Sequence, residues 1–171
     1  QRNIADITGS LIKRVTVTHP NGEKIIVGRD SPGAANLTIE NAPRGFQPAS
    51  ASVVDEYGRI LMGMALDEVA PAADKTFPKD KTTTAVIEGL TGFQVTVDMA
   101  EINGQEWIKI KAEAANDAMS KPGDSKMVDL STDWNKIMGD LNARTDGWVF
   151  QVPAYQIGPL KNRMSDLAKK P

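Results

Sequence analysis

The chain has 171 residues, 40% of them hydrophobic and 25% charged, which is typical of a folded globular protein and not of a disordered one. Its 20 Lys and Arg residues against 22 Asp and Glu give a formal net charge of -2, so the composition predicts no nucleic-acid partner. The absence of cysteine excludes disulfides, thiolate metal sites and cysteine nucleophiles. We expect a single domain over residues 1–171, because one core commonly organises about 100 to 200 residues.

The first segment places three aliphatic residues, Ile4, Ile7 and Leu11, at near-helical spacing ahead of the first convincing strand. They are the candidate interaction residues of the sequence. The sequence leaves two alternatives open, since the three side chains could pack on this domain or on one that precedes it.

Two β-branched segments, 15–17 and 25–27, flank Asn21-Gly22. Asn-Gly between such segments predicts a hairpin with a tight primed turn, because both residues tolerate a positive φ. His19 lies at the tip of this hairpin, where we expect it to be exposed to solvent. Residues 36–41 predict a short third strand after a loop.

A helical stripe of apolar residues follows and predicts a helix from Ser50 to Met64. Gly58 and Gly63 weaken that helix by about 1 kcal/mol each relative to Ala, so we expect close packing against the sheet at both. Residues 66–81, rich in proline, predict a short edge strand and a surface loop.

Residues 82–90 predict a strand, and residues 92–115 predict a second hairpin turning at Asn103-Gly104. The polar stretch Asn116–Lys126 breaks every period and predicts a mobile surface loop.

A helix capped by Ser131 or Thr132 is expected to close near Gly147. Residues 147–153 predict a strand, and Gly158-Pro159 predict the start of a last helix. The order of elements indicates the α+β class, an antiparallel β-sheet built from hairpins with about three α-helices packed on one face.

Catalytic motifs are scarce. His19 is the sole histidine, and the nucleotide-binding, nucleophile-elbow, zinc-protease and calcium-loop patterns are all missing. Ser10 and Lys13 match Ser-x-x-Lys, but a strand is expected to begin between them, whereas the dyad needs both side chains on one helix face. The many carboxylates show no convergence and are expected to line a solvated face. The sequence therefore predicts a noncatalytic protein without a metal or cofactor.

Aromatic residues leave a second possibility open. Trp134, Trp148, Phe93 and Phe150 fall on the apolar faces of their elements, which favours core packing. Aromatic side chains also anchor sugars and protein partners, so a small-ligand or glycan-binding module is the alternative function. A deep pocket lined by Trp or Tyr would favour it.

The segments LDEVAPAADKTFPKDKTTTAVIEGLTGFQVTVDMAEINGQEWIKIKAEA and LNARTDGWVFQVPAYQIGPLKNRMSDL resemble the C-terminal half of the bacterial family named domain of unknown function 4340 (DUF4340). The opening RNIADI before IKRVTVTHPNGE is similar to the segment that leads into that half, so the resemblance covers practically the whole chain. Two departures occur: NLTIEN lacks the family's Trp, and Leu-Thr-Gly stands before Phe93 in place of Phe-Asp-Gly.

The resemblance implies a fragment of a longer protein with an N-terminal membrane anchor, located on the periplasmic side of the bacterial inner membrane. Family members are associated with ABC-type transporters of the gliding-motility auxiliary kind. The expected partner is therefore a transporter or auxiliary subunit, and the family supplies no catalytic residues to carry over.

Overall fold

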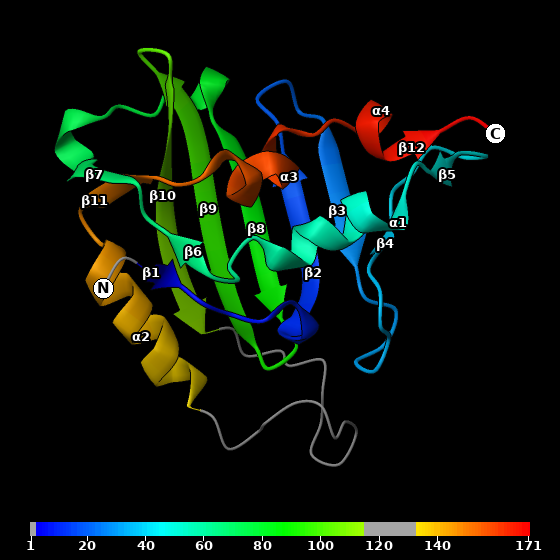
Figure 1. Cartoon of the computed structure of the whole chain (residues 1–171), viewed down its shortest axis with the longest axis horizontal. Coiled ribbons are helices and arrows are strands. Elements are labelled where there is room, and N and C mark those ends of the chain that lie inside the picture. Colours follow the sequence, from blue (N-terminus) through cyan, green and yellow to red (C-terminus); the bar gives the residue numbers. More distant parts are fainter. Residues whose placement is uncertain (1–2, 115–132) are drawn as a thin grey trace.

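The computed structural model describes residues 3–114 and 133–171, which form an α+β fold around an eight-stranded antiparallel sheet (Figure 1). The strand order is β4-β3-β2-β8-β9-β10-β11-β7. The predicted fold class is confirmed. The strands of this sheet are β2 (Ile12–Thr18), β3 (Lys24–Gly28), β4 (Thr38–Ile39), β7 (Glu68–Pro71), β8 (Thr83–Gly89), β9 (Phe93–Ile102), β10 (Gln105–Ala114) and β11 (Trp148–Gln151).

Smaller elements surround the sheet. Strand β1 (Asn3–Ala5) pairs with β6 (Met64–Ala65), and β5 (Gln47–Pro48) pairs with β12 (Ala168–Lys169).

Within the described residues no helix is both long and apolar enough to cross a bilayer. The helices are α1 (Ala51–Asp55), α2 (Trp134–Thr145), α3 (Gly158–Lys161), α4 (Met164–Leu167) and the 3-10 helices η1 (Gly9–Leu11), η2 (Glu56–Arg59), η3 (Ala72–Asp74), η4 (Lys79–Lys81) and η5 (Ala154–Ile157).

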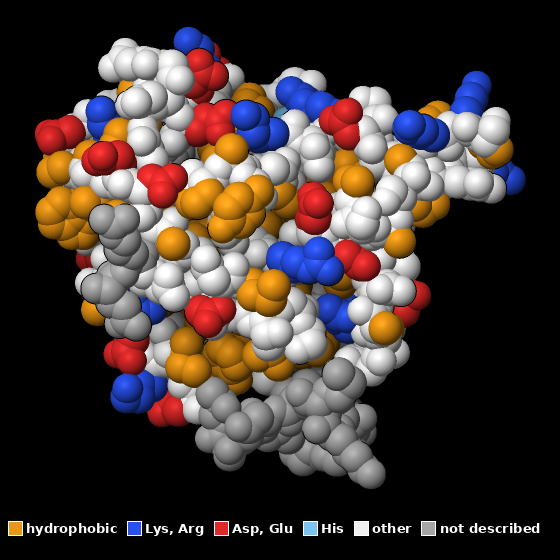
Figure 2. Space-filling model, viewed as in Figure 1, with side chains coloured by type: hydrophobic (Ala, Val, Ile, Leu, Met, Phe, Trp, Pro, Cys, Tyr) orange, Lys and Arg blue, Asp and Glu red, His pale blue; other side chains and the backbone are white. Residues whose placement is uncertain are grey.

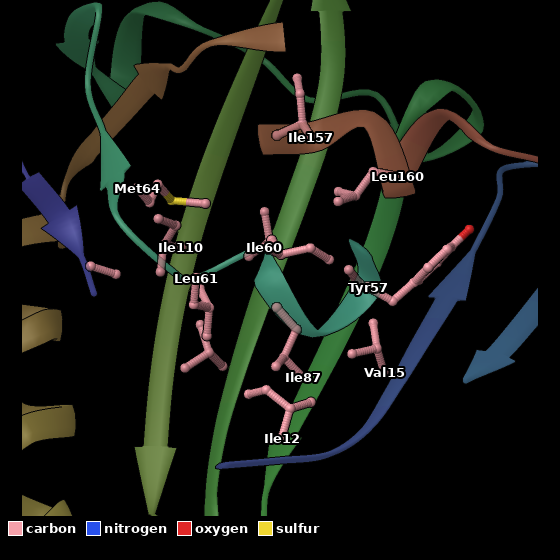
Figure 3. Packing of buried hydrophobic residues seen from close by; sticks show 14 of the residues in the cluster. Ile12, Val15, Tyr57, Ile60, Leu61, Met64, Ile87, Ile110, Ile157 and Leu160 are labelled. Carbon is pink, nitrogen blue, oxygen red and sulfur yellow. The ribbon is translucent and has the colours of Figure 1, made fainter. Parts of the chain in front are cut away.

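One face of the sheet forms the core. Buried and half-exposed residues alternate along β8 and β9, as expected for strands with one covered face. In Figure 1 the pair β1–β6, the α1–η2 segment and α3 lie across this face. Figure 3 shows Ile60 and Leu61, which follow η2, packed over Ile87 of the sheet beside Leu160 of α3.

The two hairpins have different turns. Asn103 and Gly104 have φ values of 54° and 79°, and Ile102 pairs with Gln105, which confirms the predicted tight primed turn. In the first hairpin Gly22 alone has a positive φ, and its N–H donates to the His19 carbonyl at 2.9 Å. The primed turn predicted there is therefore wrong, because Pro20 favours the ordinary type I turn that precedes Gly22.

The predicted helix from Ser50 to Met64 is shorter than expected. Ser50 does cap it, but α1 ends at Asp55 and continues as the 3-10 helix η2. Gly58 packs on η1, where an added Cβ would lie 3.6 Å from the Gly9 carbonyl oxygen. Gly63 has open space around it and a φ of 58°, so it serves the backbone and not close packing.

Helix α2 begins with Asp133 as its N-cap, whose carboxylate accepts the Lys136 N–H at 3.1 Å. The predicted caps, Ser131 and Thr132, lie outside the described residues, as does the segment Asn116–Lys126 that was predicted to be a mobile surface loop. Met138 and Leu141 are buried, so the predicted apolar stripe is confirmed.

The C-terminal segment differs from prediction and covers the first hairpin. The single helix expected from Gly158 is two short helices, α3 and α4, separated at Asn162-Arg163. His19 Nε2 donates to the Asn162 carbonyl at 2.8 Å, and the His19 residue is 4% exposed. The predicted exposure of His19 is wrong because this later segment packs over the hairpin tip.

Candidate interaction site

Strand β7 forms one edge of the large sheet. Its ladder with β11 pairs Val69 with Phe150 and Pro71 with Trp148. No second strand pairs with β7 in the part of the chain that the structure describes. Among residues 3–114 and 133–171, the backbone of this strand therefore has no strand partner on the side away from β11.

Apolar side chains accompany this open backbone. Val69 is 46% exposed and Trp148 is 44% exposed, although large apolar residues are usually covered. Figure 2 shows hydrophobic side chains gathered at the left margin of the molecule, where Figure 1 places β7 and β11. The edge thus combines free backbone groups with accessible apolar side chains.

The backbone of β7 has a defined outward direction. The Ala72 N–H donates to the Gly147 carbonyl at 2.8 Å, and hydrogen bonds in an antiparallel ladder alternate between successive residues. Val69 and Pro71 therefore direct their backbone groups away from β11. Since proline has no N–H, the outward edge offers one donor, at Val69, and two carbonyl acceptors.

The exposure of Trp148 corrects the prediction that placed it in the core. Strands β10 and β11 share one register pair in the described structure, Ile108 with Phe150, and then diverge. Phe150 and the neighbouring Val149 are buried. Trp148 lies beyond that contact, where the separated strands leave its indole open to solvent.

A cavity of about 500 Å³ occupies the space where β10 and β11 separate. Asn142 and Thr145 of α2 line it but direct hydrogen bonds to the backbone of β10. Lys109 Nζ lies 4.9 Å from the centre of the Phe77 ring. The side-chain groups left for a ligand are therefore the Trp148 indole, the Lys111 ammonium and the Asp146 carboxylate. The lining residues are Ala72, Lys109, Ile110, Lys111, Asn142, Thr145, Asp146, Gly147 and Trp148.

The interaction candidates Ile4, Ile7 and Leu11 pack on this domain. Ile4 is 3% exposed and Ile7 is 5% exposed, and both belong to the hydrophobic core, while Leu11 packs against it partly buried. Of the two alternatives left open by the sequence, packing on this domain is the one found. Ile4 and Ile7 also line a cavity of about 340 Å³ between β1 and α2, where Arg144 donates to the Ile4 carbonyl at 3.1 and 3.3 Å.

The residues considered for chemistry lie on separate elements or bind the backbone. His19 binds a backbone carbonyl, Ser10 lies on η1, and Lys13 lies on β2. Among residues 3–114 and 133–171 no three His, Cys, Asp or Glu side chains gather as metal ligands would. Phe93 is buried and stacks on Trp134 with ring centres 4.5 Å apart, which confirms their predicted core role.

None of the protein-family models, curated proteins and solved structures compared with the chain matches it. The resemblance to the DUF4340 family stays a prediction from sequence motifs.

Proposed function

We propose that the chain is a noncatalytic protein-interaction domain of the bacterial envelope, an accessory module of an ABC-type transport system. The docking element is the β7 edge, and the partner is a transporter or auxiliary subunit that adds an extended segment to it. The single observation that carries this proposal is the open edge of β7 beside the exposed side chains of Val69 and Trp148. The resemblance supports the partner class and the location.

Strand addition explains why such an edge would be kept. An added strand gains affinity from main-chain hydrogen bonds and specificity from side-chain pockets. Natural proteins usually protect edges with charges, bulges or short strands, because an open edge invites aggregation. The β7 edge is four residues long and carries Glu68 and Pro71, but it also exposes Val69, and the side chains of an added strand could contact Trp148, a residue type that often dominates binding energy.

Site-specific photocrosslinking tests the proposal. The full-length protein, expressed in its own host, would carry a photoreactive amino acid at Val69. We expect a crosslink to a transporter or auxiliary subunit. The control places the same group at Tyr155, which is 77% exposed and lies outside the β7–β11 edge. An absence of crosslinks at Val69, or the same products from both positions, contradicts the proposal.

A backbone variant sharpens the test. Val69→Pro removes the outward N–H without breaking the ladder to β11, so we expect capture of the subunit to fall at least about tenfold. The matched control is Thr76→Pro. Thr76 is exposed and follows Lys75, whose extended backbone (φ -130°, ψ 107°) suits the residue before a proline. Thr76→Pro should leave capture unchanged, and equal capture by Val69→Pro and the wild-type protein contradicts strand addition at β7.

The cavity beside Trp148 supports a second candidate function, a small-ligand or glycan-binding module. The exposed indole could stack on a sugar ring, and the Lys111 ammonium and the Asp146 carboxylate could hydrogen-bond its hydroxyl groups. Tryptophan fluorescence titrated with a panel of oligosaccharides tests this alternative. A saturable change that Trp148→Ala abolishes and Trp107→Phe retains favours it, since the Trp107 side chain is buried.

A further inference from the structure

Arg29 follows β3 and is buried, with 7% of the residue exposed. Its side chain donates three hydrogen bonds to backbone carbonyls, from Nε to Ile12 at 2.9 Å, from Nη1 to Ala34 at 2.6 Å and from Nη2 to Gly9 at 2.8 Å. A guanidinium has five N–H donors, so two are left over after these bonds.

The charge of Arg29 has no ion-pair partner among the described residues. Asp55 lines the same cavity, but its Oδ1 accepts the Leu37 N–H at 3.1 Å. Burial lowers the pKa of the Arg29 guanidinium, and the charge of Asp55 acts in the opposite direction. Buried charges are costly unless they are paired, so the site favours an added negative charge.

The cavity beside Arg29 has a volume of about 300 Å³. Arg59, an exposed residue of η2, is a second arginine in its lining. Against the one carboxylate of Asp55, the two guanidinium groups leave a single positive charge. Polar and apolar groups are both present on the walls. The remaining lining residues are Thr8, Gly9, Ser10, Pro32, Ala34, Ala35, Asn36, Leu37, Gly58 and Met62.

We propose that this cavity binds the carboxylate group of a small organic acid, held by Arg29 and Arg59. A planar carboxylate matches the fork of a guanidinium, and such charge-assisted bonds are stronger than neutral ones. Ser10 and Asn36 offer further hydrogen bonds, while Leu37 and Met62 accept an aliphatic tail. This inference is independent of partner docking at β7.

Butyrate is the probe, and butyramide, which has nearly the same shape without the charge, is the matched control. Both would be titrated into the whole 171-residue chain while backbone amide resonances are followed by NMR. We expect butyrate to shift the resonances of Ser10, Asn36 and Leu37 in a saturable way. The absence of saturable shifts, or an equal response to butyramide, overturns the proposal.

A variant tests Arg59, the exposed arginine of the pair. Arg59 is exposed, so the Arg59→Gln variant should fold. We expect the butyrate affinity of this variant to be about tenfold lower than that of the wild-type protein. Arg44→Gln, also exposed and outside the cavity lining, should leave the affinity unchanged. Equal affinities of Arg59→Gln and the wild-type protein overturn the proposed role of Arg59. Tighter binding of inorganic phosphate than of butyrate overturns the assignment to a carboxylate.

Discussion

The side-chain amide of Asn142 pairs with the backbone of Ala112 as a neighbouring strand would. It accepts the Ala112 N–H at 2.7 Å and donates to the Ala112 carbonyl at 2.5 Å. Strand β11 meets β10 at Ile108 and diverges before it reaches this point. Helix α2 therefore supplies hydrogen-bond partners for the part of the β10 edge that β11 does not pair with.

Replacing Asn142 tests this relationship. Asn142→Ala leaves the N–H and C=O of Ala112 without their partner, so we expect the free energy of unfolding to fall by about 1–3 kcal/mol. Urea denaturation measures the change. Asn135→Ala, at an exposed position of the same helix, is the control and should change stability by less than about 0.5 kcal/mol. Equal effects of the two substitutions would show that the Ala112 contact adds no stability.

Two glycines of the sheet give a second comparison. A Cβ at Gly89 would overlap the ring of Phe93, which is buried and stacked on Trp134. We expect Gly89→Ala to lower the free energy of unfolding by about 1–3 kcal/mol, because that ring has no room to move. A Cβ at Gly28 would instead overlap the end of the flexible Glu40 side chain, which is partly exposed.

Gly28→Ala should therefore be the milder change, at about 1 kcal/mol or less. Glu40 can rotate away, and the surface ion pair that it makes with Arg14 at 3.1 Å contributes little to stability. Urea denaturation of both variants provides the comparison. A larger loss for Gly28→Ala than for Gly89→Ala would contradict this explanation.

The buried phenol of Tyr57 should make the free energy of unfolding depend on pH in the alkaline range. Burial raises the pKa of Tyr57 in the folded state above its ordinary value of 10.0. Above about pH 10 the unfolded chain loses this proton while the folded chain keeps it, so the free energy of unfolding falls as pH rises. Tyr57→Phe should remove this contribution. Denaturation of both proteins from about pH 8 to 11 measures the slopes, and identical slopes would contradict the prediction.

The turn of the second hairpin gives a local test. Asn103 has a φ of 54°, a conformation that Asn and Gly tolerate better than other residues. We expect Asn103→Ala to lower the free energy of unfolding by about 1 kcal/mol, whereas Asn103→Gly should be tolerated. Thermal denaturation distinguishes the two. Equal midpoints for both variants would show that the turn conformation adds nothing to stability.

Local patterns were sufficient for the elements that are stabilised by their own neighbours. The second hairpin has β-branched segments beside Asn103-Gly104, and α2 has its apolar residues at helical spacing. The helix predicted after Ser50 is present as well, but it continues as a 3-10 helix. A stripe over so few turns does not distinguish the two kinds of helix.

The errors concern residues whose surroundings are set by distant segments. His19 is buried by Asn162, which lies far along the chain. Trp148 is exposed because β10 and β11 diverge, and the alternation within β11 carries no information about that divergence. The candidate site at β7 was partly foreseen, since the proline-rich composition of residues 66–81 predicted an edge strand, but its association with Trp148 was not.

The contact between the C-terminal segment and the first hairpin has a consequence for synthesis on the ribosome. Arg163 lies 3.1 Å from the Glu23 carboxylate, and β12 pairs with β5. Residues 162–169 emerge after every strand that they cover. All strands of the large sheet are therefore synthesised before the segment that buries His19, so this cover can form only after the sheet is complete.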